Sequence, residues 1–399
     1  MATKKSALLS ESRLRGVLFP NRVVLSPMMQ FAALDGYASD WHLVHLGKFA
    51  LGGFGTVMTE VVAIESRGRI SYGDLGLWRD DQIPPLRRIT DYIHAQGSVA
   101  AIQLGHAGRK GSWQRPWEGN GPLTDADSER GDPPWQLVGP CSAPIGEGYP
   151  SPHALTVDEI KQTVRLFGEA AARADKAGFD VLEIHGAHGY LIASFLTPLI
   201  NKRTDAYGGD AQGRMRLAQE VTAEVRSNWP ENKPLFFRMS AEDGGGPGGW
   251  DLDDSVILAS SLRELGVDVV DCSSGGLRGS ATLQNQARGP GYQVHYADTI
   301  KRGAQISTMA VGLILDGKQA EAIVESGQAD FIAVGRQAMY DPFWVLHAAQ
   351  QISTDPDFDR WQESAGWWLQ KRAGALELVG YTPAGDQKSG NYTVTEARA

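Results

Sequence analysis

Short runs of apolar residues alternate along the chain with longer segments in which apolar residues recur every three or four positions. Short apolar runs between turn residues are typical of buried strands, and the longer periodic segments are typical of helices packed on one face. We expect strands at residues 22–28, 56–63, 99–106, 181–187, 235–241, 269–275, 306–313 and 331–337. Helices are expected at about 41–51, 81–96, 156–177, 213–228, 253–265, 292–303, 317–326 and 341–351.

The ends of the predicted helices carry capping signals. Asp40 and Thr156 are expected as N-caps, and Thr156 with Glu159 has the spacing of a capping box. Glycines, which adopt left-handed backbone conformations readily, follow four of the predicted helices, at Gly97, Gly178, Gly266 and Gly327.

Eight apolar strands alternating with eight helices predict a parallel sheet covered by helices. Eight such units favour a closed (β/α)8 barrel, here one domain of residues 1–352. Residues 107–155, rich in Gly, Pro and Trp, follow the third strand and are expected to cap the active face. Residues 353–399, with Trp361, Trp367 and Trp368, form a C-terminal extension expected to pack on the barrel or a neighbouring subunit.

Composition narrows the function. The net charge of −9 argues against nucleic acid or an anionic membrane as the main partner, and no long apolar stretch predicts a membrane span. Two cysteines, Cys141 and Cys272, are too few for a disulfide scaffold or an iron–sulfur cluster. We therefore expect a protein of the reducing cytoplasm.

Barrels of this class place their working residues at the C-terminal ends of the strands. His185, His188 and Tyr190 follow the fourth strand. The two histidines could be held by local hydrogen bonds, could bind a metal if a third ligand were present, or could donate to a carbonyl oxygen with the tyrosine as acid. No metal-binding spacing accompanies them, so no metal site is predicted.

Other strand ends suggest an anionic heterocycle as ligand. Gly312, Gly335 and Arg336 end the seventh and eighth strands, where barrels often bind phosphate, although Arg336 could instead form a surface ion pair. Arg238 and Gln103 lie in otherwise apolar strands, so each needs a polar partner inside the barrel.

These residues belong to segments that resemble the old yellow enzyme family, specifically its bacterial, thermophilic-like ene-reductase branch. The resemblance runs from about Leu14 to Asp341. Its segments include Phe19–Arg22, Ser26–Met28, Asp40–Leu43, Gly68–Ile70, Gln103–Lys110, Glu183–Leu191, Phe195–Pro198, Asn201–Asp205, Tyr207–Gly209, Gly289–Gln293 and Val334–Arg336.

The resemblance implies a bound FMN, reduced by NADPH or NADH, that reduces the C=C bond of an enone or similar activated alkene. It implies that His185 and His188 bind the substrate carbonyl and that Tyr190 protonates the α-carbon. It assigns Phe31 and Lys110 to the substrate. It assigns to FMN the residues Pro27, Met28, Met29, Val61, Gln103, His185, Arg238, Gly312, Gly335 and Arg336.

The chain departs from the branch at two positions beside the flavin. Met29 stands where a cysteine that tunes the flavin is usual, and a thioether cannot donate a hydrogen bond. Phe31 stands where a tyrosine is usual. The branch also implies a homo-oligomer, dimer or tetramer, in which an arginine of the tail, with Arg372 as the candidate, completes a neighbouring site.

Three alternatives remain open. The chain could be another FMN barrel enzyme, such as a dihydroorotate-type dehydrogenase or a relative of demethylating amine oxidases. It could be a flavin-binding protein with weak reductase activity that binds a steroid-like or quinone ligand. It could also be a barrel without flavin.

Overall fold

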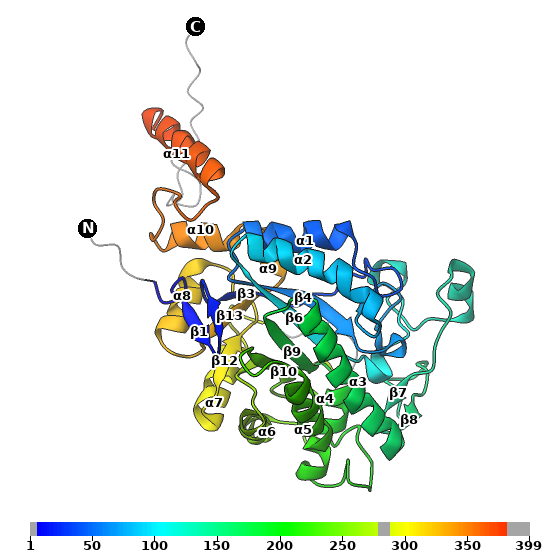
Figure 1. Ribbon diagram of the computed structural model, residues 1–399. Helices are drawn as coiled ribbons and strands as arrows, with labels where there is room; N and C mark the ends of the chain where they lie inside the picture. The colour runs from blue at the N-terminus through cyan, green and yellow to red at the C-terminus, as the bar shows by residue number, and fades with distance from the viewer. Residues whose placement is uncertain (1–5, 278–287, 381–399) are drawn as a thin grey trace.

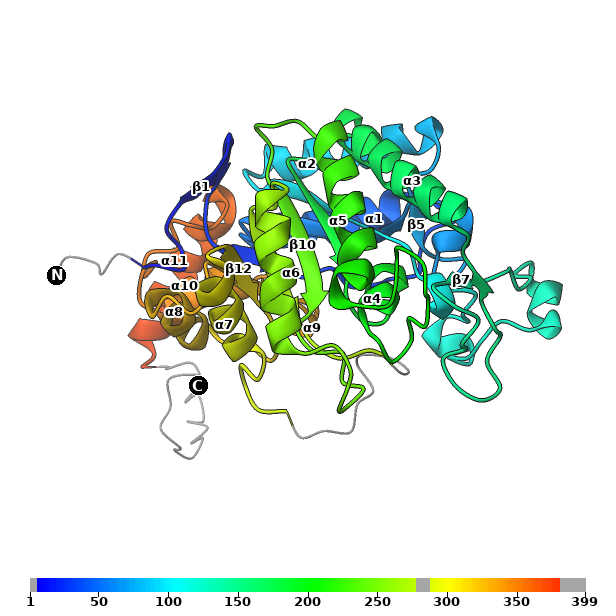
Figure 2. The same ribbon diagram turned by 90° about the horizontal axis from the view of Figure 1, so that it is seen from below.

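The computed structural model describes residues 6–277 and 288–380, and its centre is a closed barrel of eight parallel strands (Figures 1 and 2). Each strand pairs in parallel with the next, and the last pairs with the first, so the barrel closes. This confirms the predicted (β/α)8 fold. The strands are β3 (Val23–Leu25), β4 (Thr56–Ala63), β6 (Val99–Gly105), β9 (Val181–Gly186), β10 (Leu235–Ser240), β11 (Val269–Ser273), β12 (Ser307–Ala310) and β13 (Phe331–Val334).

Helices cover the outside of the barrel, and each predicted helix is present with its ends shifted by a few residues. They are α1 (Asp40–Leu51), α2 (Ile83–Ala95), α3 (Val157–Lys176), α5 (Ala211–Asn228), α6 (Leu252–Glu264), α7 (Val294–Ala304), α8 (Gly317–Glu325) and α10 (Trp344–Gln351). Shorter elements are η1 (Ser66–Gly68), β5 (Leu75–Gly76), η2 (Asp80–Gln82), α4 (Leu191–Leu196) and α9 (Arg336–Tyr340).

The capping predictions hold with one correction. The backbone N–H of Glu159 donates to Thr156 Oγ1 over 3.3 Å, and the N–H of Thr156 donates to the Glu159 carboxylate over 2.7 Å. The prediction of Asp40 as N-cap is wrong: Ser39 occupies that position, and Asp40 is the first helical residue, where its negative charge favours the helix dipole. The four glycines after helices all have positive φ, from 77° to 93°.

The interior of the barrel changes from apolar to polar along its axis, from the N-terminal to the C-terminal ends of the strands. Because alternate residues of a strand share a face, Val181, Glu183 and His185 of β9 all point inward. An apolar layer that includes Val181, Phe236 and Val269 fills the N-terminal part of the barrel. Polar side chains follow towards the C-terminal ends, and the site is built on them.

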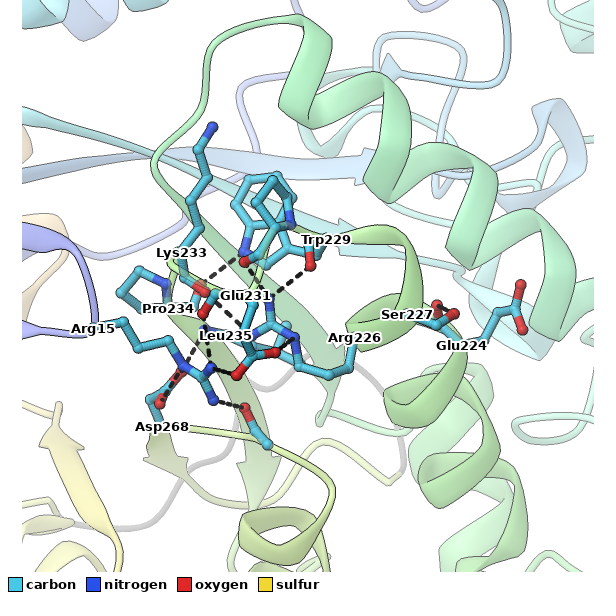
Figure 3. A network of polar contacts seen from close by, with 12 residues as sticks. Arg15, Glu224, Arg226, Ser227, Trp229, Glu231, Lys233, Pro234, Leu235 and Asp268 are labelled. Carbon is cyan, nitrogen blue, oxygen red and sulfur yellow. Dashed lines mark hydrogen bonds and ion pairs between the residues drawn. The ribbon is translucent and has the colours of Figure 1, made fainter.

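The N-terminal hairpin, which the sequence pattern did not predict, is tied to the N-terminal face of the barrel. Strands β1 (Ser12–Leu14) and β2 (Val17–Phe19) pair around Arg15. Arg15 Nε lies 2.8 Å from both carboxylate oxygens of Asp268, and its guanidinium also contacts Glu231 (Figure 3). The neighbouring Arg226 donates to the carbonyl oxygens of Trp229, Pro230 and Lys233. Charges on this face thus fasten loops that precede β10 and β11.

Residues 107–155 and the described part of the C-terminal extension, residues 353–380, lie on opposite sides of the molecule in both views (Figures 1 and 2). The first segment contains three turns of 3-10 helix, η3 (Gly108–Lys110), η4 (Pro116–Glu118) and η5 (Asp125–Arg130). It also contains β7 (Val138–Gly139), paired with β8 (His153–Ala154). None of the described helices is both long and apolar enough to cross a membrane.

The C-terminal extension packs on the barrel only in its first part. The ring of Trp361 stacks on Phe343, with 5.4 Å between centroids. Helix α11 (Glu363–Leu378) projects away from the barrel (Figure 1), and Trp367 and Trp368 are 50% and 67% exposed. Helix α11 therefore does not pack on the barrel, and the other expectation for it, packing on a neighbouring subunit, stays a prediction. Residues 381–399 of the extension lie outside the described residues.

Candidate functional site

A cavity of about 730 Å³ opens at the C-terminal ends of the barrel strands. All the residues that the sequence assigned to the chain's own site line it, because the ends of parallel strands in a closed barrel meet at one rim. They are Pro27, Met28, Met29, Phe31, Val61, Gln103, Lys110, His185, His188, Tyr190, Arg238, Gly312, Gly335 and Arg336. Arg372, the candidate for a neighbouring site, lies exposed on α11.

Three ring side chains cluster on one side of this cavity. The centroid of His185 lies 5.2 Å from that of His188 and 5.1 Å from that of Tyr190. His188 Nε2 lies 2.8 Å from Ser273 Oγ, and its backbone N–H donates to Ser240 Oγ. His185 Nδ1 is buried and has no hydrogen-bond partner among the described residues. The cluster therefore presents an unmet polar atom to the cavity.

Burial sets the protonation of these rings. Burial lowers the pKa of both histidines well below the usual value, and the positive charge of Arg238 lowers them further. Both are neutral at neutral pH, so each keeps one N–H that can donate. Burial also raises the pKa of Tyr190, and the charge of Asp74 adds to the effect. Tyr190 thus holds its proton until a strong acceptor takes it.

Lys110 closes this side of the cavity. Its ammonium donates to the carbonyl oxygens of His188 (2.7 Å) and Gly276 (2.8 Å), and lies 5.1 Å from the centroid of the Tyr190 ring. Burial lowers its pKa to about 7, with a smaller contribution from Arg109. Lys110 fixes the backbone at His188 and places beside Tyr190 an amino group that carries a positive charge below about pH 7.

The floor of the cavity carries Gln103 and Arg238. Gln103 Nε2 donates to Glu183 Oε1 over 2.6 Å. Arg238 Nε lies 3.2 Å from Asp271 Oδ2, and Arg238 donates a long bond of 3.4 Å to Ser26 Oγ. Both cavity-lining side chains are thus oriented from behind by buried carboxyl groups.

The segment from Pro27 to Phe31 forms one wall, and Gln30 and Phe31 hold it in place. The backbone N–H of Gln30 donates to the buried carboxyl of Glu60, and the Gln30 amide donates to the carbonyl oxygens of Met28 and Met29. Phe31 adopts a left-handed conformation (φ 55°), which a bulky residue rarely does. Met29 therefore lines the cavity from a fixed backbone.

The opposite end of the cavity suits a phosphate group. A Cβ on Gly312 (φ 114°) would lie 2.9 Å from both the Gln293 amide and the Tyr292 ring, so only glycine fits there. Gly335 caps the start of α9, and Arg336 is its first residue. Backbone N–H groups at a helix start together with a guanidinium are suited to an anion.

These features fit the FMN that the resemblance implies. Arg238 and Gln103 would face the flavin ring, and Gly312, Gly335 and Arg336 would face its phosphate. The unpartnered nitrogen of His185 and the polar layer inside an otherwise apolar barrel agree with a polar ligand. Among residues 6–277 and 288–380, no group of three or more metal-ligating side chains occurs.

Sequence reasoning missed several residues of the cavity. Trp113, Pro116 and Asn120 line it from the inserted segment 107–155, and Arg288 and Tyr292 line it near Gly312. None ends a strand, so the rule that identified the other residues did not apply to them. For the inserted segment, Trp and Asn after a strand were a weak signal, and Tyr292 lies in the segment Gly289–Gln293 that carries the resemblance.

Comparison with known proteins gives a consistent result. The sequence model of the NADH:flavin oxidoreductase / NADH oxidase family matches residues 13–355. The NADPH dehydrogenase of Listeria monocytogenes serotype 4a is 41% identical over 349 residues, which are 87% of this chain and 95% of that protein. The NADPH dehydrogenase of Bacillus licheniformis is 43% identical over 343 residues, 86% of this chain and 93% of that protein.

Solved structures agree on the fold. Morphinone reductase has a TM-score of 0.69 at 23% identity, covering 88% of this chain and 91% of its own. The old yellow enzyme homologue from Zymomonas mobilis has a TM-score of 0.67 at 24% identity, covering 84% of this chain and 90% of its own. At these identities the likeness shows a shared barrel and no more.

Proposed function

The chain belongs to the NADH:flavin oxidoreductase / NADH oxidase family, and from that premise we propose that it reduces the C=C bond of α,β-unsaturated carbonyl compounds. Its cofactors are FMN and NAD(P)H, as in the old yellow enzymes. When bound, FMN supplies the hydride chemistry that links the nicotinamide to the alkene. Everything else is done by side chains of the cavity.

The observation that carries the proposal is the cluster of His185, His188 and Tyr190. The two neutral imidazoles can donate to one carbonyl oxygen, which draws electron density from the β-carbon of a conjugated alkene. Tyr190, 5.1 Å from His185 between ring centroids, holds a proton that the α-carbon needs. A saturated amine substrate would use neither the paired donors nor the acid.

The remaining residues of the cavity would bind FMN and shield the reacting atoms from water. Arg238 would place a positive charge beside the flavin ring, which becomes negative when reduced, and Gln103 would bond the polar edge of the ring. Gly312, Gly335 and Arg336 would hold the phosphate. Phe31 and Trp113 line the cavity and would help to exclude water from the reacting atoms.

Anaerobic stopped-flow absorbance of the purified holoprotein tests the proposal. NADPH is added first, and the yellow flavin band should bleach. Addition of 2-cyclohexenone should then restore the band as the alkene is reduced. NADH in the first step gives the coenzyme preference.

Each other outcome assigns a different function. Bleaching without reoxidation by the enone would contradict alkene reduction and favour another FMN barrel dehydrogenase or a flavin-binding protein with weak activity. A colourless protein that takes up no FMN would contradict the flavin site itself.

A further inference from the structure

Two buried carboxyl groups lie behind the floor of the cavity, inside the barrel. Glu183 is on β9 and Asp271 is on β11, with Arg238 on the strand between them. In the strand register Gln103 pairs with Glu183, and Arg238 pairs with Asp271. Gln103 and Arg238 line the cavity, so the two acids stand directly behind the residues assigned to the flavin ring.

The two carboxyl groups have different partners. Glu183 Oε1 accepts from Gln103 Nε2 over 2.6 Å, whereas Oε2 has no hydrogen-bond partner among the described residues. Neither oxygen of Asp271 makes a hydrogen bond to the described residues, but Oδ2 lies 3.2 Å from Arg238 Nε, so its neighbour is a permanent positive charge. Both side chains are fully buried.

Charge balance shows which acid can ionise. An ionised carboxylate in an apolar interior is costly unless a cation lies beside it. Arg238 is the charged group that acts on both acids, and it is adjacent to Asp271. His185 and His188 are neutral, and Lys110 lies beside Tyr190. The single positive charge of Arg238 therefore balances the charge of one carboxylate, and Asp271 lies nearer to Arg238 than Glu183 does.

The direction of the pKa shifts agrees with this arrangement. Burial raises the pKa of both acids. The charge of Asp271 raises the pKa of Glu183 further, and the charge of Arg238 offsets part of the rise on both acids.

We propose that Glu183 is a positioning residue of the flavin site that stays protonated, orients the amide of Gln103, and leaves Asp271 as the single carboxylate that balances Arg238. The proposal rests on the FMN site of the proposed function but not on the alkene as substrate.

The proposal has a chemical consequence for the flavin. With Glu183 neutral, the Arg238–Asp271 pair carries no net charge behind the ring. With both acids ionised, the group would carry a net negative charge and would oppose the anionic reduced flavin. A protonated Glu183 also engages Gln103 Nε2 through its carbonyl oxygen, which leaves Gln103 Oε1 for a donor on the flavin.

Infrared spectroscopy of the holoprotein tests the protonation directly. A protonated carboxyl has a carbonyl stretch that a carboxylate lacks. The difference spectrum between wild type and Glu183→Gln at neutral pH should contain this band, and the band should shift when the wild type carries 13C-labelled glutamate. A difference spectrum that shows only carboxylate bands would overturn the proposal.

The label keeps the experiment informative if Glu183→Gln does not fold. Among the described glutamates, Glu60 is the other one whose pKa is raised on balance, mainly by burial. A labelled band that survives in Glu60→Gln then belongs to Glu183. Loss of the whole band in Glu60→Gln would contradict the proposal.

Flavin redox potentials provide a second, independent readout. Glu183→Gln should leave the potential unchanged, because a neutral amide replaces a neutral acid. Asp271→Asn should raise the potential, because it removes a negative charge behind the ring. The reverse pattern, with a rise in Glu183→Gln, would show that Glu183 is ionised.

Flavin affinity tests the positioning role. Glu183→Leu removes the acceptor for Gln103 and should weaken FMN binding about tenfold, the scale of one buried hydrogen bond. Glu183→Gln should restore the affinity. Equal weakening in both variants would contradict an acceptor role. Failure of enone reduction with these results intact would reject the proposed substrate and leave this inference standing.

Discussion

An arginine at each end of the barrel differs from the other in its burial and in its contacts within the protein. At the N-terminal face, Arg15 contacts Asp268, Glu231 and the carbonyl oxygen of Gly266, and its side chain is 21% exposed (Figure 3). At the C-terminal face, Arg238 is only 8% exposed, yet its protein contacts are Asp271 at 3.2 Å and a long bond to Ser26.

The comparison distinguishes charged side chains that stabilise the fold from charged side chains that can bind a ligand. Buried polar groups in native proteins are nearly always satisfied, so an arginine that is more buried and less bonded indicates a missing partner. The same holds for His185 Nδ1. Substitutions at the N-terminal face should therefore affect mainly stability, whereas those at the C-terminal face should also affect flavin binding or catalysis.

Arg238→Ala should have the largest effect. It leaves Asp271 buried without its cation, which should cost about 3–5 kcal/mol in the free energy of unfolding. It should also weaken FMN binding roughly 10- to 100-fold, since a charged hydrogen-bond donor is lost. Chemical unfolding and flavin titration measure the two effects.

A double substitution separates these two losses. Arg238→Ala with Asp271→Asn removes the stranded carboxylate, so most of the stability should return while FMN binding stays weak. Recovery of both properties would contradict the assignment of Arg238 to the flavin.

Tyr190→Phe should have an intermediate effect confined to one half-reaction. Without its proton, reoxidation of the reduced flavin by 2-cyclohexenone should slow roughly 100-fold, or about 2.7 kcal/mol in the barrier. Reduction of the flavin by NADPH should change little. Stopped-flow absorbance measures the rate of each half-reaction. Equal slowing of the two half-reactions would contradict the assignment of Tyr190 as the proton donor.

Arg15→Ala should have the smallest effect and should act on stability alone. Loss of contacts to two partly exposed acids should cost about 1–2 kcal/mol in unfolding free energy, with flavin content and both half-reactions unchanged. Arg13→Ala is the matched control, because Arg13 on the same hairpin makes only a 3.4 Å bond to the Gly16 carbonyl oxygen. A loss of flavin in Arg15→Ala would break the comparison between the two ends.

The barrel was predictable because burial on both faces leaves a clear trace in sequence. Strands such as β3 and β13 are continuous apolar runs, and the glycines after helices identify where several of the helices end. The β1–β2 hairpin left no such trace, since its strands are three residues long and partly exposed. Helix α11 shows no clear apolar face, so its exposure could not be predicted from the sequence pattern. The homo-oligomer implied by the resemblance stays a prediction.

The site was predictable as a list of residues but not as a set of contacts. Strand ends identify His185, Arg238 and Gly335 because the fold brings all such ends to one rim. Spacing also places Glu183 on the face of His185. It does not say that Gln103 lies across from Glu183, because the register between strands depends on the closure of the whole barrel.

That closure has a consequence for how the protein is assembled. Strands β3 and β13, the first and last of the barrel, pair with each other, and contacts so distant in sequence carry a large entropic cost during folding. Pro27 and Met28 follow one of these strands, and Gly335 and Arg336 follow the other. If FMN contacts both pairs of residues, as we propose, its binding connects the first and last strands and favours the closed barrel by mass action. FMN would then contribute to the stability of the fold that binds it.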